Sequence, residues 1–297
     1  MHFYLTRRKY DPASDTFTKE IAPKTSYVVL PKDNVNAGFR TDQADWLSKI
    51  AGGGGPKDVV IFVHGFNTSQ DKMLTRLRKL KTGLRKNNFG VAVVGFSWPN
   101  RERARGYWKD RDDVPKFAKS LLHDGIQPIR AMASKPRVHV LCHSMGAYVF
   151  LHALSAEGIA QRIDQLAFVA SDLDESWMRP GEPAEKVVHN HTKRLTNYYS
   201  PTDRVLDLSA TWIHGEPRVG GVGLSRHAKP SQQDVACSNR YQARPVPPKK
   251  DRTNSHVWYF DDEKWLRDLA QVLARSNAGQ IDTRLPSTTP PDQVLAP

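Results

Sequence analysis

Residues 138–154, VHVLCHSMGAYVFLHAL, place two apolar segments on either side of a short turn. The first four residues, 138–141, predict a buried strand, and residues 146–154 predict an apolar helix. Ser144 lies in the turn between them, and the small Gly146 follows two positions later. A serine on such a tight strand-to-helix turn is held in a strained conformation with its hydroxyl above the sheet. We therefore take Ser144 as a candidate nucleophile.

Apolar runs of similar length recur on both sides of this turn. They predict four further strands, at residues 59–63, 91–96, 166–170 and 195–199. Apolar residues at helical spacing predict helices at 73–84 and 114–126, the second one interrupted near Gly125 and Pro128. Strands separated by roughly 25 to 45 residues are typical of right-handed βαβ units. The sequence therefore predicts an α/β fold, with a mainly parallel central sheet and helices on both faces.

The flanks of this core carry weaker patterns. We divide the chain into N-terminal strands with a linker, a core domain and a tail, at residues 1–57, 58–276 and 277–297. In the first part, residues 2–10 and 25–30 are expected to add two strands. In the core domain, residues 208–252 show little periodicity, which predicts an irregular excursion over the sheet edge before a final amphipathic helix at 265–273. The polar, proline-rich tail is expected to be disordered.

Composition and charge exclude several classes of protein. The 297 residues carry 44 lysines and arginines against 31 acidic residues, a net charge of +13, which excludes an acidic disordered chain. No apolar run approaches the roughly 18 residues that a membrane-spanning helix needs. The first charged residues follow a short apolar stretch, the reverse of a secretory signal, so we expect a cytoplasmic protein. Cys142 and Cys237 lack metal-ligand spacing, and we predict neither a metal nor a cofactor.

Six segments, in this order, resemble the α/β-hydrolase superfamily, and more narrowly a bacterial group described as domain of unknown function 900. They are VIFVHGFN (60–67), VGFSWPN (94–100), HVLCHSMGAYVFLHAL (139–154), FVASDLD (168–174), YYSPTDRVLDLS (198–209) and SHVWYF (255–260). The resemblance implies the α/β-hydrolase fold and a catalytic triad of Ser144, Asp203 and His256. Two positions depart from the group's pattern, because Cys142 replaces the usual Gly or Ala and Ser171 replaces a proline. Neither change removes a catalytic atom.

The acid of this triad has competing candidates. In the superfamily the acid follows the serine along the chain and the histidine comes last. Asp203 fits this order, because it follows the last predicted core strand in a Ser-Pro-Thr-Asp turn. Asp172 and Asp174, after the preceding strand, are the alternatives, although either residue would also suit a helix N-cap.

The histidines divide by their position in the chain. His256 lies just before the final amphipathic helix, where a loop returns to the strand ends. His214 and His227 lie in the irregular excursion, where we expect a solvated histidine. His64 ends an early strand, and there a structural hydrogen-bonding role is favoured over catalysis.

The resemblance also implies an oxyanion hole. The residues His64-Gly65-Phe66-Asn67 end a strand at the place where α/β-hydrolases supply the second oxyanion donor. We expect the backbone N–H groups of Phe66 and Met145 to converge on the substrate carbonyl. Gly65 would let the loop backbone approach the substrate.

These residues lead to three hypotheses about function. The first is a serine hydrolase that cleaves a small-molecule carboxylic ester through an acyl-enzyme. Residues 72–86 carry seven cations and no acid between them, and residues 101–111 carry five more. A solvated face explains such patches in most proteins, but they also motivate a lipase or phospholipase at anionic lipid surfaces. The third hypothesis is a basic module that binds nucleic acid with an idle triad; nucleic acid is disfavoured, because no nucleic-acid fold signature accompanies the patches.

Overall fold

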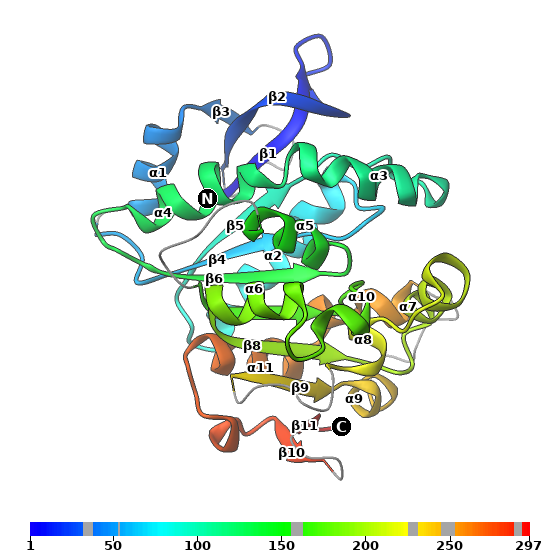
Figure 1. Cartoon of the computed structure of the whole chain (residues 1–297). Helices are drawn as coiled ribbons and strands as arrows, with labels where there is room; N and C mark the ends of the chain where they lie inside the picture. Colours follow the sequence, from blue (N-terminus) through cyan, green and yellow to red (C-terminus); the bar gives the residue numbers. More distant parts are fainter. Residues whose placement is uncertain (32–37, 53, 156–162, 225–230, 245–252, 288–292) are drawn as a thin grey trace.

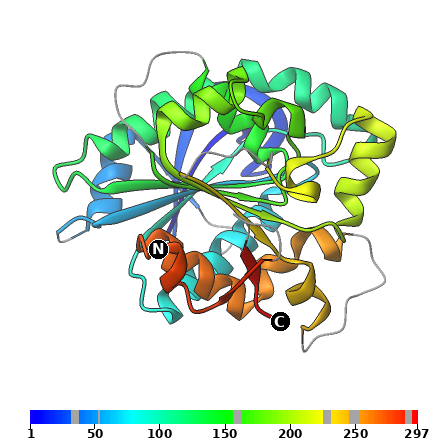
Figure 2. The same cartoon turned by 60° about the horizontal axis from the view of Figure 1, so that its bottom comes forward.

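The computed structural model describes residues 1–31, 38–52, 54–155, 163–224, 231–244, 253–287 and 293–297. Its strands form one sheet in the spatial order β10-β11-β9-β8-β7-β6-β4-β5-β1-β2-β3. Helices cover both faces of this sheet (Figures 1 and 2). The described part of the chain therefore has the predicted α/β architecture.

Six adjacent parallel strands form the centre of the sheet. They are β5 (Ala92–Ser97), β4 (Asp58–Val63), β6 (Arg137–His143), β7 (Ile163–Val169), β8 (Thr192–Tyr199) and β9 (Gln232–Ala236). Five of them were predicted, because central parallel strands are buried on both faces and read as apolar runs. Every residue of β4 is buried. The carboxyl ends of parallel strands meet at one edge of a sheet, which is where ligands bind in such folds.

Two layers of helices cover the faces of the sheet. α2 (Gln70–Lys86) and α11 (Glu263–Leu273) pack against each other on one face. α5 (Gly146–Leu154) and α6 (Pro183–His191) lie together on the other face (Figure 2). The helices expected at 73–84, 146–154 and 265–273 are thus confirmed.

Further helices connect these elements. They are α1 (Gln43–Ala51), α3 (Tyr107–Asp113), α4 (Gln127–Arg130), α7 (Arg204–Leu208), α8 (Val219–Val222), α9 (Ser238–Gln242) and α10 (Asn254–Val257). The helix expected over 114–126 is interrupted, but earlier than Gly125 and Pro128 predicted, because the break follows a 3₁₀ turn, η2 (Val114–Lys116). A π-helical turn, η3 (Leu121–Ile126), contains Gly125 and continues directly into α4, which contains Pro128. None of the described helices is long and apolar enough to cross a membrane.

The N-terminal segment extends the sheet on one side. β1 (His2–Asp11) pairs in parallel with β5 and antiparallel with β2 (Thr16–Leu30). β3 (Phe39–Thr41) adds the outermost strand on this side. The strands expected at 2–10 and 25–30 are confirmed. The hairpin of β1 and β2 is therefore continuous with the core sheet.

The prediction of an irregular excursion at 208–252 is partly wrong. This segment contains β9, which pairs in parallel with β8. Its sequence, QQDVA, contains no apolar run. Asp234 is nevertheless buried in this strand, and hydrogen bonds satisfy its carboxylate. The Asp234 carboxylate accepts from Asn197 Nδ2 at 2.7 Å and from the Leu224 N–H at 2.6 Å. Residues 225–230 and 245–252 of the excursion lie outside the described residues.

The prediction of a disordered tail is wrong for its described residues. β10 (Arg284–Pro286) and β11 (Gln293–Leu295) pair with each other, and β11 pairs in parallel with β9. Arg284 is buried and forms an ion pair with the buried Asp268 of α11, with Arg284 Nη2 2.6 Å from Asp268 Oδ1. Strands of three residues that depend on an ion pair carry no hydrophobic periodicity, so no pattern predicts them.

Candidate active site

The turn between β6 and α5 holds Ser144 in a left-handed backbone conformation. Its φ is +54°, which is unfavourable for a residue with a Cβ atom. The Ser144 N–H donates to the Val169 carbonyl at 3.0 Å, and the Ser144 carbonyl accepts from the Asp172 N–H at 3.3 Å. These bonds to the end of β7 and the loop after it hold the strained turn in place. The backbone at Ser144 is therefore strained, as the sequence predicted.

Gly146 allows the turn to pack against β4. A Cβ atom at this position would lie 2.4 Å from the Val63 carbonyl oxygen and 2.8 Å from that of His64. Both contacts are with backbone, which cannot move aside, so only glycine fits here. Cys142 is fully buried in β6 opposite Val63, and burial raises the pKa of its thiol well above the usual value. Its thiol is accommodated near the end of β6 and stays protonated.

Asp203 and His256 meet at the carboxyl edge of the sheet. The His256 Nδ1–H donates to Asp203 Oδ2 at 2.8 Å. The other carboxylate oxygen, Asp203 Oδ1, accepts from the N–H groups of Val205 at 3.0 Å and Leu206 at 3.1 Å. Asp203 thereby caps α7, and it is 1% exposed. Both oxygens are committed, so the carboxylate has a fixed orientation toward the imidazole.

Neighbouring residues hold the backbone around His256. The His143 Nε2–H donates to the His256 carbonyl at 2.9 Å, and the two rings lie 4.7 Å apart. Burial lowers the pKa of His143 well below the usual value, so this ring is neutral. The Arg204 N–H donates to Ser255 Oγ at 3.1 Å. His256 therefore lies beside the residue that precedes Ser144.

Ser144 Oγ itself makes no hydrogen bond within the described part of the chain. In free enzymes the bond from nucleophile to base is often long and tightens when substrate binds. Ser144, Asp203 and His256 thus lie in adjoining segments at one edge of the sheet. Of the two hydrogen bonds that a triad requires, the structure contains the one between His256 and Asp203.

The loop after β4 lies directly against Ser144. A Cβ atom on Gly65 would lie 2.8 Å from the Ser144 Cβ, so the loop backbone and the serine are in contact. Within the described residues, neither the Phe66 N–H nor the Met145 N–H donates a hydrogen bond. Free backbone donors in the two segments that meet at a nucleophile are what an oxyanion site requires.

His64 has the structural role that the sequence favoured. It is fully buried, and its Nδ1–H donates to the Gly65 carbonyl at 2.9 Å. Its Nε2 accepts from the Trp98 N–H at 3.1 Å, and its ring stacks on the Trp98 indole at 4.9 Å. Burial lowers the pKa of His64 to about 3. The ring therefore stays neutral and joins the loop after β4 to the loop after β5.

Asp172 and Asp174, the alternative acids, are engaged elsewhere. Asp172 Oδ1 accepts from Arg218 Nε at 3.1 Å and from Ser209 Oγ at 2.8 Å, and Oδ2 accepts from the Tyr107 hydroxyl at 2.6 Å. Asp174 also pairs with Arg218, and its side chain makes no helix-capping bond. These carboxylates belong to a buried ion-pair network next to the site.

The expectation that His214 is solvated is wrong. Its side chain is 6% exposed, and its Nε2–H donates to the Tyr107 hydroxyl oxygen at 2.6 Å. Burial lowers the pKa of His214. Tyr107 also packs its ring 5.2 Å from Phe66, so the network adjoins the loop after β4. Sequence reasoning missed these contacts, because each joins distant segments and leaves no local pattern. His227 lies outside the described residues.

The comparison with protein families decides the superfamily. Residues 40–241 match the family described as alpha/beta hydrolase of unknown function (DUF900). The chain belongs to this family. The sheet and its strained serine turn are accordingly those of the α/β-hydrolase fold. His256 and the hairpin of β1 and β2 lie outside the matched residues.

Relatives of this α/β hydrolase are distant. An uncharacterized protein from Nostoc sp. (strain PCC 7120) is 30% identical over 141 residues, which is 40% of this chain, and the chain spans only 35% of that relative's length. Among solved structures, the peroxisomal alpha-beta-hydrolase Lpx1 from Saccharomyces cerevisiae is 12% identical, with a TM-score of 0.37, over 85% of this chain and 83% of that one. A lipase-esterase related protein from Clostridium acetobutylicum is 9% identical, with a TM-score of 0.34, over 74% and 94%. At these scores the likeness carries no argument about activity.

Possible metal ligands in this α/β hydrolase are dispersed. Across the described ranges, no three His, Cys, Asp or Glu side chains are grouped so that they could hold a metal ion. The prediction that the protein needs no metal or cofactor stays a prediction.

Proposed function

We propose that this α/β hydrolase cleaves carboxylic esters through an acyl-enzyme. His256 takes the proton from Ser144 Oγ as the oxygen attacks the ester carbonyl. Asp203 holds the imidazole in the correct tautomer and stabilises the imidazolium that forms. The N–H groups of Phe66 and Met145 bind the developing oxyanion. His256 then gives the proton to the leaving alcohol, and water releases the acid in a second half-reaction.

One observation carries this proposal: the buried Asp203–His256 hydrogen bond at 2.8 Å lies at the same sheet edge as the strained Ser144. A strained serine alone is compatible with a structural turn. A buried carboxylate with one oxygen on a helix cap and the other on an imidazole is what a nucleophile's base requires. Together they favour acyl transfer over a passive role for the fold.

The proposal is tested with p-nitrophenyl esters from acetate to palmitate. We expect the wild-type protein to hydrolyse at least the shorter esters and Ser144→Ala to lose this activity. Full activity in Ser144→Ala would exclude Ser144 as the nucleophile. The ester of highest kcat/KM would also define the acyl-chain preference.

A specific observation favours a lipase acting at anionic surfaces as a second candidate. Trp108 on α3 is 52% exposed, and Leu208 and Trp212 are 42% and 80% exposed near the carboxyl edge. The Trp108 ring lies 5.1 Å from that of His214, so α3 adjoins the π-helical turn η5 (Ser209–His214). Exposed tryptophans beside cations are typical of surfaces that contact lipid headgroups. Three exposed cations flank Trp108: Arg103, Arg105 and Lys109.

Sedimentation with vesicles tests this candidate without any turnover. Vesicles that contain phosphatidylserine should retain the protein, and Trp108→Ala with Trp212→Ala should release it. Phe39→Ala is the matched control, because Phe39 is 65% exposed on the distant β3. Equal binding to neutral and anionic vesicles, or equal loss in the control, would count against a lipid-surface enzyme.

A further inference from the structure

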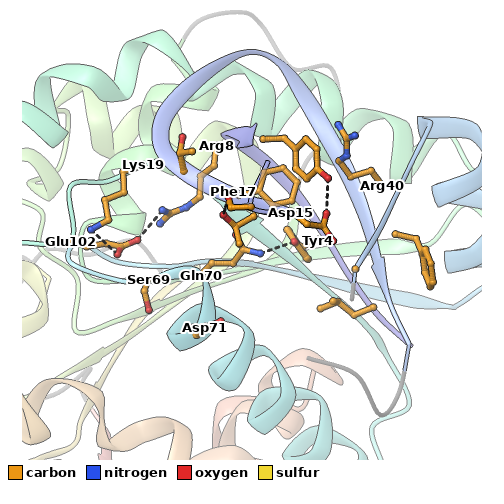
Figure 3. Close-up of a pocket in the computed structure, with 17 residues that line it drawn as sticks. Tyr4, Arg8, Asp15, Phe17, Lys19, Arg40, Ser69, Gln70, Asp71 and Glu102 are labelled. Carbon is orange, nitrogen blue, oxygen red and sulfur yellow. Dashed lines mark hydrogen bonds and ion pairs between the residues drawn. The ribbon is translucent and has the colours of Figure 1, made fainter. Parts of the chain in front are cut away.

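Arg8 of β1 is a buried cation that the proposed chemistry does not use. Its side chain is 1% exposed, although it belongs to the N-terminal hairpin outside the matched family region. It forms part of the wall of a cavity of about 940 Å³ between this hairpin and the start of α2 (Figure 3). Burying a guanidinium costs free energy unless hydrogen-bond acceptors compensate for the lost water. The acceptors of Arg8 therefore indicate which parts of the structure it stabilises.

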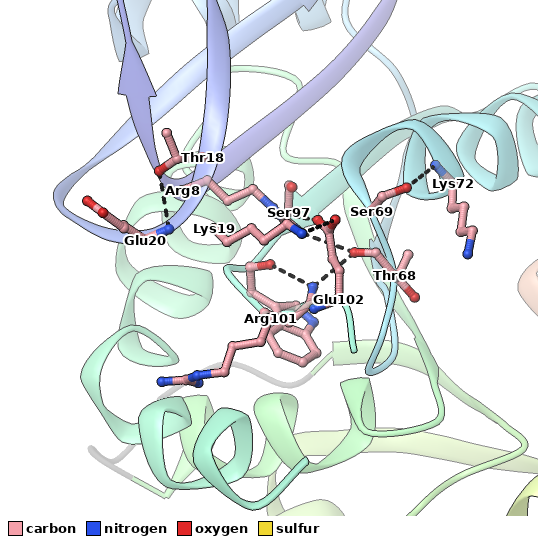
Figure 4. Close-up of polar contacts among 12 residues, drawn as sticks. Arg8, Thr18, Lys19, Glu20, Thr68, Ser69, Lys72, Ser97, Arg101 and Glu102 are labelled. Carbon is pink, nitrogen blue, oxygen red and sulfur yellow. Dashed lines mark hydrogen bonds and ion pairs between the residues drawn. The ribbon is translucent and has the colours of Figure 1, made fainter. Parts of the chain in front are cut away.

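The guanidinium connects two loops at the carboxyl edge of the sheet (Figure 4). Arg8 Nη2 donates to the Thr68 carbonyl at 3.0 Å, in the loop after β4. Arg8 Nη1 donates to Glu102 Oε1 at 2.9 Å, in the loop after β5. Asn100 Nδ2, from this second loop, donates to the same Thr68 carbonyl at 2.9 Å. The Thr68 carbonyl is therefore held from two sides.

Thr68 in turn holds Phe66. The Thr68 hydroxyl donates to the Phe66 carbonyl at 3.1 Å, and Arg76 Nη1 donates to the Thr68 hydroxyl at 3.3 Å. Between Phe66 and Thr68, Asn67 has a φ of +51°, the left-handed conformation that asparagine adopts more readily than most residues with a Cβ atom. Contacts from Arg8 and Asn100 thus fix the residue that closes this left-handed turn.

We propose that Arg8 is a positioning residue for the oxyanion hole, acting through Thr68 on the Phe66 N–H. This inference rests on the proposed function, in which that N–H binds the oxyanion. An oxyanion donor must be aimed at the transition state, and a shift of about 1 Å in such a group lowers turnover up to about 100-fold. The N-terminal hairpin is on this account part of the catalytic machinery.

Steady-state kinetics of Arg8→Met and Arg8→Lys test the proposal. Arg8→Lys keeps the charge beside Glu102, but a single ammonium lacks the planar fork that spans both loops. We expect kcat to fall about tenfold or more in both variants, with KM within about twofold of wild type. The matched control is Lys19→Met, because Lys19 also pairs with Glu102, at 3.3 Å, but is 56% exposed and donates no hydrogen bond to Thr68. A merely structural role would instead lower the melting temperature and leave kcat of the folded protein unchanged.

A second readout is independent of turnover. Protein labelled with ¹⁵N-phenylalanine gives one amide resonance for each of the 11 phenylalanines, and Phe66→Leu identifies that of Phe66. We expect this resonance to shift or broaden in Arg8→Lys and to stay in place in Lys19→Met. An unmoved Phe66 resonance with unchanged kcat would overturn the proposal. If the wild type hydrolyses no ester, the proposed function fails, but the resonance still tests the role of Arg8. A shifted Phe66 resonance in Arg8→Lys would then support the positioning of Phe66 by Arg8. An unshifted resonance would refute it.

Discussion

At the scale of single residues, Asp203 has two simultaneous roles. One oxygen caps α7 and the other holds the His256 imidazole. Asp203→Asn retains a capping oxygen but loses the charge that stabilises the imidazolium, so we expect kcat to fall up to about 10⁴-fold with the fold intact. Steady-state kinetics measure the fall in kcat, and circular dichroism checks that the fold is intact. Asp172→Asn is the comparison, and its main effect should be on stability because Asp172 pairs with Arg218. The reverse pattern would assign the acid to Asp172.

His64 makes a prediction about pH. Its pKa is lowered to about 3 in the folded protein, against 6.5 in an exposed histidine, because it is buried. Between these values the unfolded chain binds the extra proton, so lowering the pH favours unfolding. From pH 6.5 to about pH 5, His64 should reduce the free energy of unfolding by about 2 kcal/mol. Urea unfolding at the two pH values should show a smaller loss in His64→Gln than in wild type. An equal loss in both would mean that His64 titrates normally.

Some of the residues at the candidate site could be predicted from the sequence, and others could not. Ser144 and Asp203 could be selected because each follows the end of a predicted strand, and the ends of parallel strands share one edge. His256 could be selected because it lies just before the final amphipathic helix, where a loop returns to that edge. Their catalytic roles stay predictions. Arg8 and His214 could not be selected, since their burial depends on partners about 60 and 107 residues away.

At the scale of elements, the two adjacent glycines of α8 allow a controlled experiment. A Cβ atom on Gly220 would lie 2.2 Å from the Ser171 nitrogen, whereas one on Gly221 would meet only Leu206 Cβ at 3.9 Å. The Gly220 carbonyl also accepts from the Ser200 N–H at 2.8 Å, which supports the turn that carries Asp203. We expect Gly220→Ala to destabilise the protein by about 1–3 kcal/mol or more.

Denaturant unfolding of both variants checks this prediction. Gly221→Ala should stay within about 0.5 kcal/mol of wild type. Equal stability of the two variants would show that α8 can move away from the end of β7. A loss of ester hydrolysis confined to Gly220→Ala would link the same contact to the position of Asp203.

Elements differ in how well their sequences reveal them. β4, β6 and β7 are apolar because both of their faces are covered by helices, so their sequences predicted them. β9 and β10 depend on polar contacts instead, Asp234 with Asn197 and Arg284 with Asp268. Helix α2 is amphipathic, so its sequence predicted it, but its charged face is not wholly free. Lys79 and Lys86 form exposed ion pairs with Asp261 and Glu263, which precede and begin α11.

At the scale of the whole molecule, the described residues of the tail belong to the folded unit, because β10 and β11 extend the sheet. Removing residues 277–297 would leave the Asp268 carboxylate, which is fully buried, without the guanidinium of Arg284. Breaking such a pair costs about 3–5 kcal/mol. We expect the truncated chain and Arg284→Met both to lose stability of this order in denaturant unfolding. Arg267→Met is the control, because its pair with Asp282 is exposed and should cost less than about 1 kcal/mol. A truncated chain as stable as wild type would contradict this contribution of the tail to stability.

The candidate site likewise draws on more of the molecule than the matched family region. His256 lies after that region, and Arg8 of the hairpin lies before it. Residues 40–241 alone would retain Ser144 and Asp203 but lack the histidine that pairs with Asp203. The arrangement therefore combines the matched region with Arg8 of β1 before it and His256 of α10 after it.

The central claim is that Ser144 is a nucleophile activated by His256 and Asp203. A fluorophosphonate probe tests it most directly, because the probe reacts with an activated serine whatever the natural ester is. The protein is incubated with the probe, and the adduct is located by intact mass and peptide mapping. We predict one adduct per chain, on Ser144, slowed in His256→Ala and absent in Ser144→Ala. An unmodified wild-type protein, or equal labelling of Ser144→Ala, would contradict the account.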